Sequence, residues 1–193
     1  MATPELRASL AKEQLACIDA LGPLPSGRVR EGAAAAVALI ERATRVDWLP
    51  MTALVAVLDA TLAVLGPAEA AAHWRRSTLR SLEIPLVKPF LDGVLSVFNP
   101  SPATTMPMYP KLFSLLYRNV GAVTVDVIEP GLLIITHSQL PASVTASSAW
   151  ASSMAASYDA TLQFLRAKAP RVSFTVDAAT ARCSFMLRWT PDR

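Results

Sequence analysis

The sequence predicts an α+β fold, in which an N-terminal helical bundle is followed by a β-hairpin, a helix and a second β-hairpin. Helical periodicity broken by Gly and Pro runs through residues 1–120, whereas residues 121–193 contain two segments that alternate around a turn. The chain has 193 residues, of which 52% are hydrophobic and 17% charged, so it can bury one core. We therefore expect a single domain over residues 1–193.

Gly and Pro divide the N-terminal part into expected helices. These helices cover residues 4–21, Ser26 to Ile40, Asp47 to Leu65, Pro67 to Leu82, and an apolar segment that ends near Phe98. Ser26 and Asp47 are the expected N-caps, and Gly66-Pro67 is the expected break between the third and fourth helices. Four prolines in residues 99–110 predict a surface loop, which a short helix over 111–119 follows.

The hairpins carry the clearest pattern. The period-two alternation typical of strands lies on both sides of a Pro130-Gly131 turn in residues 123–137, VTVDVIEPGLLIITH. The same pattern recurs in residues 171–189 around the turn DAATA. A helix from about Thr145 to Ala169, ended by Pro170, places one apolar stripe on a face: Trp150, Met154, Tyr158, Leu162 and Leu165. An isolated hairpin is only marginally stable in water, so we expect one four-stranded antiparallel sheet with this stripe against it.

The order of helices, hairpin, helix and hairpin resembles a ligand-binding fold. Vinyl-reductase-type domains, haem nitric-oxide-binding sensors and TRAPP vesicle-tethering subunits share that fold. PKLFSLLYRNVGAVTVDVIEPG, residues 110–131, is similar to an uncharacterised paralogous family from myxobacteria, whose matching positions are Leu116, Tyr117, Arg118, Asn119 and Gly121. The resemblance covers residues 47–189 and implies a binding fold rather than a reaction.

The chain departs from the known ligand sites of these families. It lacks the Tyr-x-Ser-x-Arg motif of the haem sensors. Cys17 and Cys183, the two cysteines, cannot supply the metal cluster that vinyl-reductase-type domains often carry, and Cys17 is a poor positional match for the acylated cysteine of TRAPP subunits. No cofactor is therefore predicted.

Candidate ligand- or partner-binding residues fall into two groups. The apolar group lies in or just after the proline-rich segment and comprises Met106, Met108, Tyr109, Phe113 and Leu116. Such residues can close over a pocket or face a partner, and they can equally seal the core. The polar group is His73 and Arg76, although a histidine with no Cys, Asp or Glu at ligand spacing is more commonly a packed or surface residue.

No catalytic or metal-ligating residue is predicted, because the chain has no phosphate-binding glycine loop and no nucleophile elbow. The formal charge of +3 is not concentrated in a run, so a nucleic-acid partner is not expected. The sequence contains no signal peptide and no uninterrupted apolar segment of ~20 residues, so we expect a cytoplasmic protein without a transmembrane segment.

The predicted function is a non-enzymatic binding or protein-interaction module. It would form a homodimer or dock on a partner protein, with an apolar pocket for a small molecule or lipid between helices and sheet. One alternative is a small-molecule sensor or regulatory domain. A less favoured alternative is an enzyme without a recognisable motif.

Overall fold

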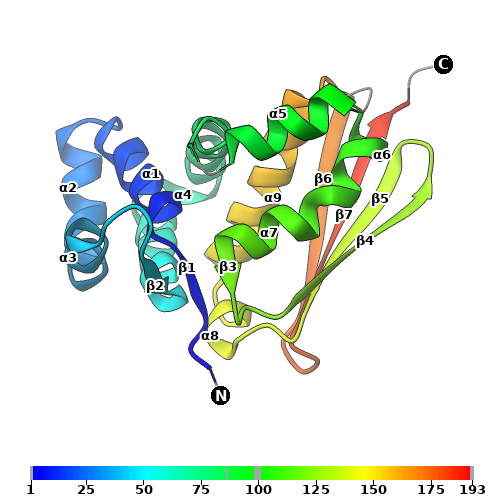
Figure 1. The fold of residues 1–193 in the computed structure, drawn as a ribbon. Coiled ribbons are helices and arrows are strands. Elements are labelled where there is room, and N and C mark those ends of the chain that lie inside the picture. Colours follow the sequence, from blue (N-terminus) through cyan, green and yellow to red (C-terminus); the bar gives the residue numbers. More distant parts are fainter. Residues whose placement is uncertain (1, 86, 98–100, 192–193) are drawn as a thin grey trace.

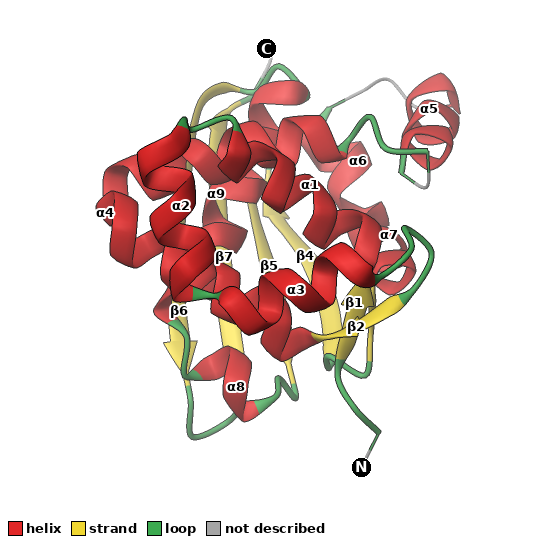
Figure 2. Ribbon diagram, turned by 90° about the vertical axis from the view of Figure 1, so that its left-hand side faces the viewer, coloured by secondary structure: helices red, strands yellow, loops and turns green. Residues whose placement is uncertain are grey.

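The structure, a computed structural model, describes residues 2–85, 87–97 and 101–191 and has the expected α+β architecture. A layer of helices lies against one face of a four-stranded sheet (Figures 1 and 2). The helical elements are α1 (Ala8–Asp19), α2 (Pro23–Gly32), α3 (Ala34–Arg42), α4 (Met51–Ser81), α5 (Lys88–Val97), α6 (Pro102–Thr105), the 3-10 turn η1 (Met106–Met108), α7 (Tyr109–Leu116), α8 (Ala142–Thr145) and α9 (Ser148–Phe164). The strands are β1 (Glu5–Arg7), β2 (Trp48–Pro50), β3 (Tyr117–Arg118), β4 (Ala122–Glu129), β5 (Leu132–Ser138), β6 (Lys168–Asp177) and β7 (Arg182–Thr190).

The two hairpins form one antiparallel sheet in the order β4-β5-β7-β6, as the alternation predicts. β5 and β7 pair in the centre, where His137 lies opposite Cys183 and Ile135 opposite Phe185. Directly opposite residues share a face, and all four are fully buried. α9 packs on β6 and β7, and its stripe from Trp150 to Leu165 is buried against this face.

A second, small sheet was not predicted from the sequence. It has the order β2-β1-β3 and occupies positions expected to be helix. Its buried residues are Leu6, Leu49 and Tyr117, while the guanidinium groups of Arg7 and Arg118 lie 4.0 and 4.5 Å from the ring centroid of Trp48. Its strands have two or three residues, too few to show a period of two.

Both expected N-caps are wrong. α2 begins at Pro23, directly after Gly22, so Ser26 lies inside the helix. Proline is favoured at the first helical position because its missing N–H needs no partner there. Asp47 accepts a hydrogen bond from the Thr44 N–H at 2.7 Å and thereby closes the turn before β2.

The expected break at Gly66-Pro67 is present as a kink. α4 is one bent element in which Gly66 alone has non-helical dihedral angles, φ 74° and ψ 169°. α4 is also the one helix among the described residues that is long and apolar enough to cross a membrane. This is weak evidence for membrane crossing, because the core helix of a soluble protein meets the same criterion and α4 packs on α1, α2, α3 and α9.

The proline-rich segment is not a loop over its described part. Residues 102–110 form α6, η1 and the start of α7. Ser101 and Thr104 cap α6 reciprocally, and prolines occupy the first turns of α6, η1 and α7. These prolines start helices rather than break them. Phe98, Asn99 and Pro100 lie outside the described residues.

The central helix also ends earlier than expected. α9 stops at Phe164, and Pro170 lies within β6, where the pairing register with β7 shifts between Lys168 and Arg171. Proline is tolerated at such an irregularity because no ladder N–H is needed there.

Candidate functional site

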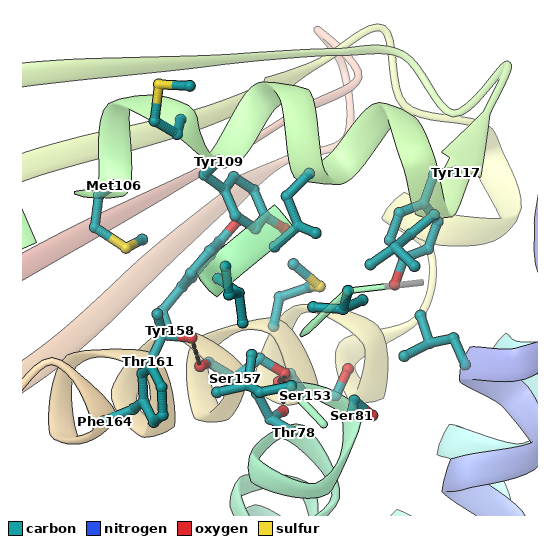
Figure 3. Close-up of a pocket in the computed structure, with 18 of the residues that line it drawn as sticks. Thr78, Ser81, Met106, Tyr109, Tyr117, Ser153, Ser157, Tyr158, Thr161 and Phe164 are labelled. Atoms are coloured by element: carbon teal, nitrogen blue, oxygen red, sulfur yellow. Dashed lines mark hydrogen bonds between the residues drawn. The ribbon is translucent and has the colours of Figure 1, made fainter. Parts of the chain in front are cut away.

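A cavity of about 130 Å³ lies between α7 on one side and α4 and α9 on the other (Figure 3). Most of its wall is apolar and comes from five helices, the 3-10 turn and neighbouring loop residues. The apolar lining residues are Leu10, Leu54, Leu58, Leu82, Val87, Leu91, Met106, Met108, Leu112, Leu116, Trp150, Met154, Phe164 and Leu165. Apolar walls with a few polar groups are typical of small-molecule sites.

One wall of the cavity is polar. We call it the hydroxyl strip, and it consists of Thr78, Ser81, Ser153, Ser157 and Thr161. Its residues recur every three or four positions on α4 and α9, which places them on the facing sides of these two helices. The Thr78 hydroxyl donates to the Ser157 hydroxyl at 2.8 Å and so links α4 to α9.

The other four hydroxyls of the strip donate to main-chain carbonyl oxygens of their own helices. Their acceptors lie three or four residues earlier, at distances of 2.8 to 2.9 Å: Ser81 to Ser77, Ser153 to Trp150, Ser157 to Ser153, and Thr161 to Ser157. Serine and threonine commonly bond back to the preceding helical turn in this way.

Three tyrosines also line the cavity, Tyr109, Tyr117 and Tyr158, and its remaining lining residues are Gln14 and Thr105. The rings of Tyr109 and Tyr158 meet edge to face with centroids 5.2 Å apart. Burial raises the pKa of all three phenols, so they are neutral at physiological pH. Tyr158 also makes a 2.6 Å hydrogen bond to His137 Nε2, which lies behind the wall.

Both histidines lie outside the cavity lining. Burial lowers the pKa of His137 to about 3, and burial together with the charge of Arg76 lowers the pKa of His73 to about 4. Both imidazoles are therefore neutral at physiological pH. His73 is buried in α4, and Arg76 on the same helix is exposed.

The structure brings together four of the predicted binding residues. Met106, Met108, Tyr109 and Leu116 line the cavity. Phe113 lies outside the lining and stacks on Tyr117 with ring centroids 4.4 Å apart. His73 and Arg76 are not part of this site, and whether any of the seven residues binds a ligand stays a prediction.

Sequence reasoning missed the hydroxyl strip. None of its five residues is among the candidate binding residues that the sequence indicated. A usable signal was present, because hydroxyl residues recur at spacings of four on α9, at Ser153, Ser157 and Thr161.

Comparisons with known proteins identify the fold. No family model matches the sequence, and no curated protein matches it. Several solved structures are similar over nearly the whole chain. One is an oxygen-binding H-NOX domain related to soluble guanylate cyclases, with a TM-score of 0.60, 7% identity, and 96% of each chain covered.

Two further structures agree with the first. An Fe(II) unliganded H-NOX protein from K. algicida has a TM-score of 0.62 at 8% identity, covering 97% of this chain and 98% of that chain. A structure from a study of haem distortion in the H-NOX family has a TM-score of 0.62 at 9% identity, covering 97% of each chain. This chain has the H-NOX fold.

The described residues of this H-NOX fold do not fit a haem in the cavity. Haem iron is usually held by a histidine or a cysteine thiolate, and less commonly by methionine with histidine or by a tyrosinate. Among the described lining residues there is no histidine or cysteine, and burial disfavours the tyrosinate form of the three phenols. The volume of about 130 Å³ is also small beside the ~300–1,000 Å³ of ordinary ligand pockets.

Proposed function

We propose that this chain is a small-molecule-binding domain of the sensor or regulatory type, which uses the H-NOX fold without haem. The apolar cavity between α4, α7 and α9 carries the proposal. A dry apolar cavity of about 150 Å³ is known to take up benzene, so one of about 130 Å³ has room for a molecule of roughly one aromatic ring.

Its fold supports the sensor alternative more than the interaction module. The H-NOX structures above include one described as oxygen-binding and one from a study of haem, so the same architecture serves small molecules in other proteins. Four expectations stay predictions from the sequence: homodimer formation, docking on a partner protein, a cytoplasmic location and kinship with the myxobacterial family. Sedimentation velocity of the full chain tests the homodimer.

An enzyme has less support. The titratable groups among the described lining residues are the three tyrosines, whose raised pKa values make them poor general bases near neutral pH. Ligand binding without a reaction requires none of them to ionise.

The proposal is tested with compact aromatic probes and the methionine methyl groups as reporters. Met106, Met108 and Met154 line the cavity, whereas Met186 is a partly exposed residue of β7 outside it. In protein labelled with ¹³C at the methionine methyls, fluorobenzene or phenol should shift the three lining signals and leave that of Met186 in place. Native mass spectrometry of freshly purified protein then looks for a retained small molecule.

α7 offers a matched pair of control variants. Leu112 lines the cavity, and Leu115 on the same helix is 38% exposed and does not line it. Leu112→Trp should fill the cavity and abolish the methyl shifts, and Leu115→Trp should preserve them. Shifts that survive in Leu112→Trp, or no shift with either probe in the unmodified chain, contradict the proposal.

A further inference from the structure

We propose that the ligand of this cavity is a neutral, compact hydroxyl compound, an alcohol or a phenol. The inference deepens the proposed function and rests on it. Two features of the cavity wall carry it. The residue types on the wall indicate the charge of the ligand, and the hydrogen bonds that the wall already makes indicate its polar group.

The charge of the ligand follows from the residue types on the wall. Among the described lining residues there is no Asp, Glu, Lys, Arg or His. An ionised group buried without a partner pays a large desolvation cost, which a wall of this kind cannot offset. The three phenols are held in their neutral form as well. A carboxylate or an ammonium ion is therefore excluded in favour of a neutral molecule.

The hydroxyl strip indicates which polar group the ligand carries. A serine or threonine hydroxyl has one proton to donate and two lone pairs that accept. All five protons of the strip are already donated, one between the helices and four into the helix backbone. The strip therefore offers oxygen lone pairs to a ligand, and these are matched by a ligand that donates a hydrogen bond.

Buried polar atoms without a hydrogen-bond partner also occur in residues that line the cavity. Among the described lining residues, Gln14 Oε1, Thr105 Oγ1 and Trp150 Nε1 are buried and have no hydrogen-bond partner. Buried polar atoms are rarely left unpaired, because each costs stability. Gln14 Oε1 is an acceptor, the Thr105 hydroxyl can donate and accept, and the Trp150 indole N–H is a donor only. A ligand hydroxyl supplies the donor that the lone pairs of the strip need, whereas an ether or a carbonyl oxygen only accepts.

The test compares phenol, fluorobenzene and benzoate by calorimetry at pH 7. Phenol and fluorobenzene have similar sizes but differ in the hydrogen-bond donor, and benzoate carries a charge. Because phenol loses more hydration than fluorobenzene on binding, the informative quantity is the ratio of their affinities in two forms of the protein. Thr78→Val with Ser157→Ala removes two acceptors of the strip at nearly constant shape, and this should lower the phenol-to-fluorobenzene ratio by roughly 2- to 10-fold.

Thr175→Val is the matched control, since Thr175 is an exposed residue of β6 outside the cavity. It should leave the ratio unchanged. An unchanged ratio in the double variant overturns the inference, and so does binding of benzoate as tight as that of phenol to the unmodified chain, a result that needs no variant to fold. Failure of both phenol and fluorobenzene to bind overturns the proposed function instead.

Discussion

His137 Nε2 and the Tyr158 hydroxyl lie 2.6 Å apart and join the central strand β5 to helix α9. Aromatic rings surround this pair, with the ring centroids of Trp150 and Phe185 at 5.5 and 5.6 Å from that of the imidazole. Tyr158 faces the cavity on its other side. The hydrogen bond therefore fixes a wall of the candidate site to the core of the sheet.

Tyr158→Phe should lower the free energy of unfolding by about 1–3 kcal/mol, because it leaves a buried nitrogen of His137 without a partner. Tyr117→Phe is the same change at another buried tyrosine, which stacks on Phe113 and whose hydroxyl makes no hydrogen bond to another described residue. It should cost little. Urea denaturation of both variants measures the difference, and equal losses would argue against a role for the hydrogen bond.

Acidification should destabilise the protein below pH 6.5. The pKa of an unfolded histidine is about 6.5, whereas burial lowers that of His73 to about 4 and that of His137 to about 3. Stability from these residues is fully present above pH 6.5. It is lost as the pH falls toward these folded-state pKa values, because only the unfolded chain takes up protons there, at up to about 1.4 kcal/mol per pH unit for each histidine.

Urea denaturation at pH 7, 6 and 5 measures this loss. His73→Gln should remove about half of the slope, since it removes one of the two titrating groups. Equal stability at pH 7 and pH 5 would show that the histidines ionise freely in the folded protein.

The sequence predicted the parts of the fold that have a long regular pattern. Alternation over 123–137 and 171–189 and the stripe on α9 each extend over many residues, so the period identifies the element. The small sheet has strands of two or three residues, and its pairing joins β1 to a segment more than one hundred residues away, which no local pattern reveals.

The candidate site was predictable only on its apolar side. Met106, Met108, Tyr109 and Leu116 stood out as clustered large apolar residues, whereas the prolines among them suggested a loop rather than helix starts. The hydroxyl strip was hidden because serine and threonine also serve as small packing residues in helices. Only the pairing of α4 with α9 brings Thr78 to Ser157.

Addition of ferric haem to the purified chain should produce no Soret band of a six- or five-coordinate complex. No histidine or cysteine lies among the described residues that line the cavity. His137 is held by Tyr158 and surrounded by rings. Absorbance spectroscopy during titration, with the Leu112→Trp variant in parallel, measures this. A stoichiometric Soret shift in the unmodified chain that Leu112→Trp abolishes would place haem in the cavity.

Gly131→Ala should destabilise the sheet strongly. Gly131 has φ +87°, a conformation that costs an L-residue about 1–2 kcal/mol. An added Cβ would also lie 2.5 Å from the Trp189 carbonyl oxygen, while the Trp189 N–H donates to the Gly131 carbonyl at 2.9 Å. The main chain of β7 would have to move, and this hydrogen bond between the ends of the two hairpins would weaken.

Gly27→Ala is the matched control, because Gly27 lies within α2 and an added Cβ there meets nothing within 4 Å. Alanine is favoured over glycine in a helix by up to about 1 kcal/mol, so this variant should melt at the same or a slightly higher temperature. At about 2–4 °C per kcal/mol for a chain of this length, calorimetry should separate the two variants by several degrees. If Gly131→Ala has the same melting temperature as the unmodified protein, the turn at Pro130-Gly131 tolerates a side chain. Gly131 would then not be needed to hold the register of the two hairpins.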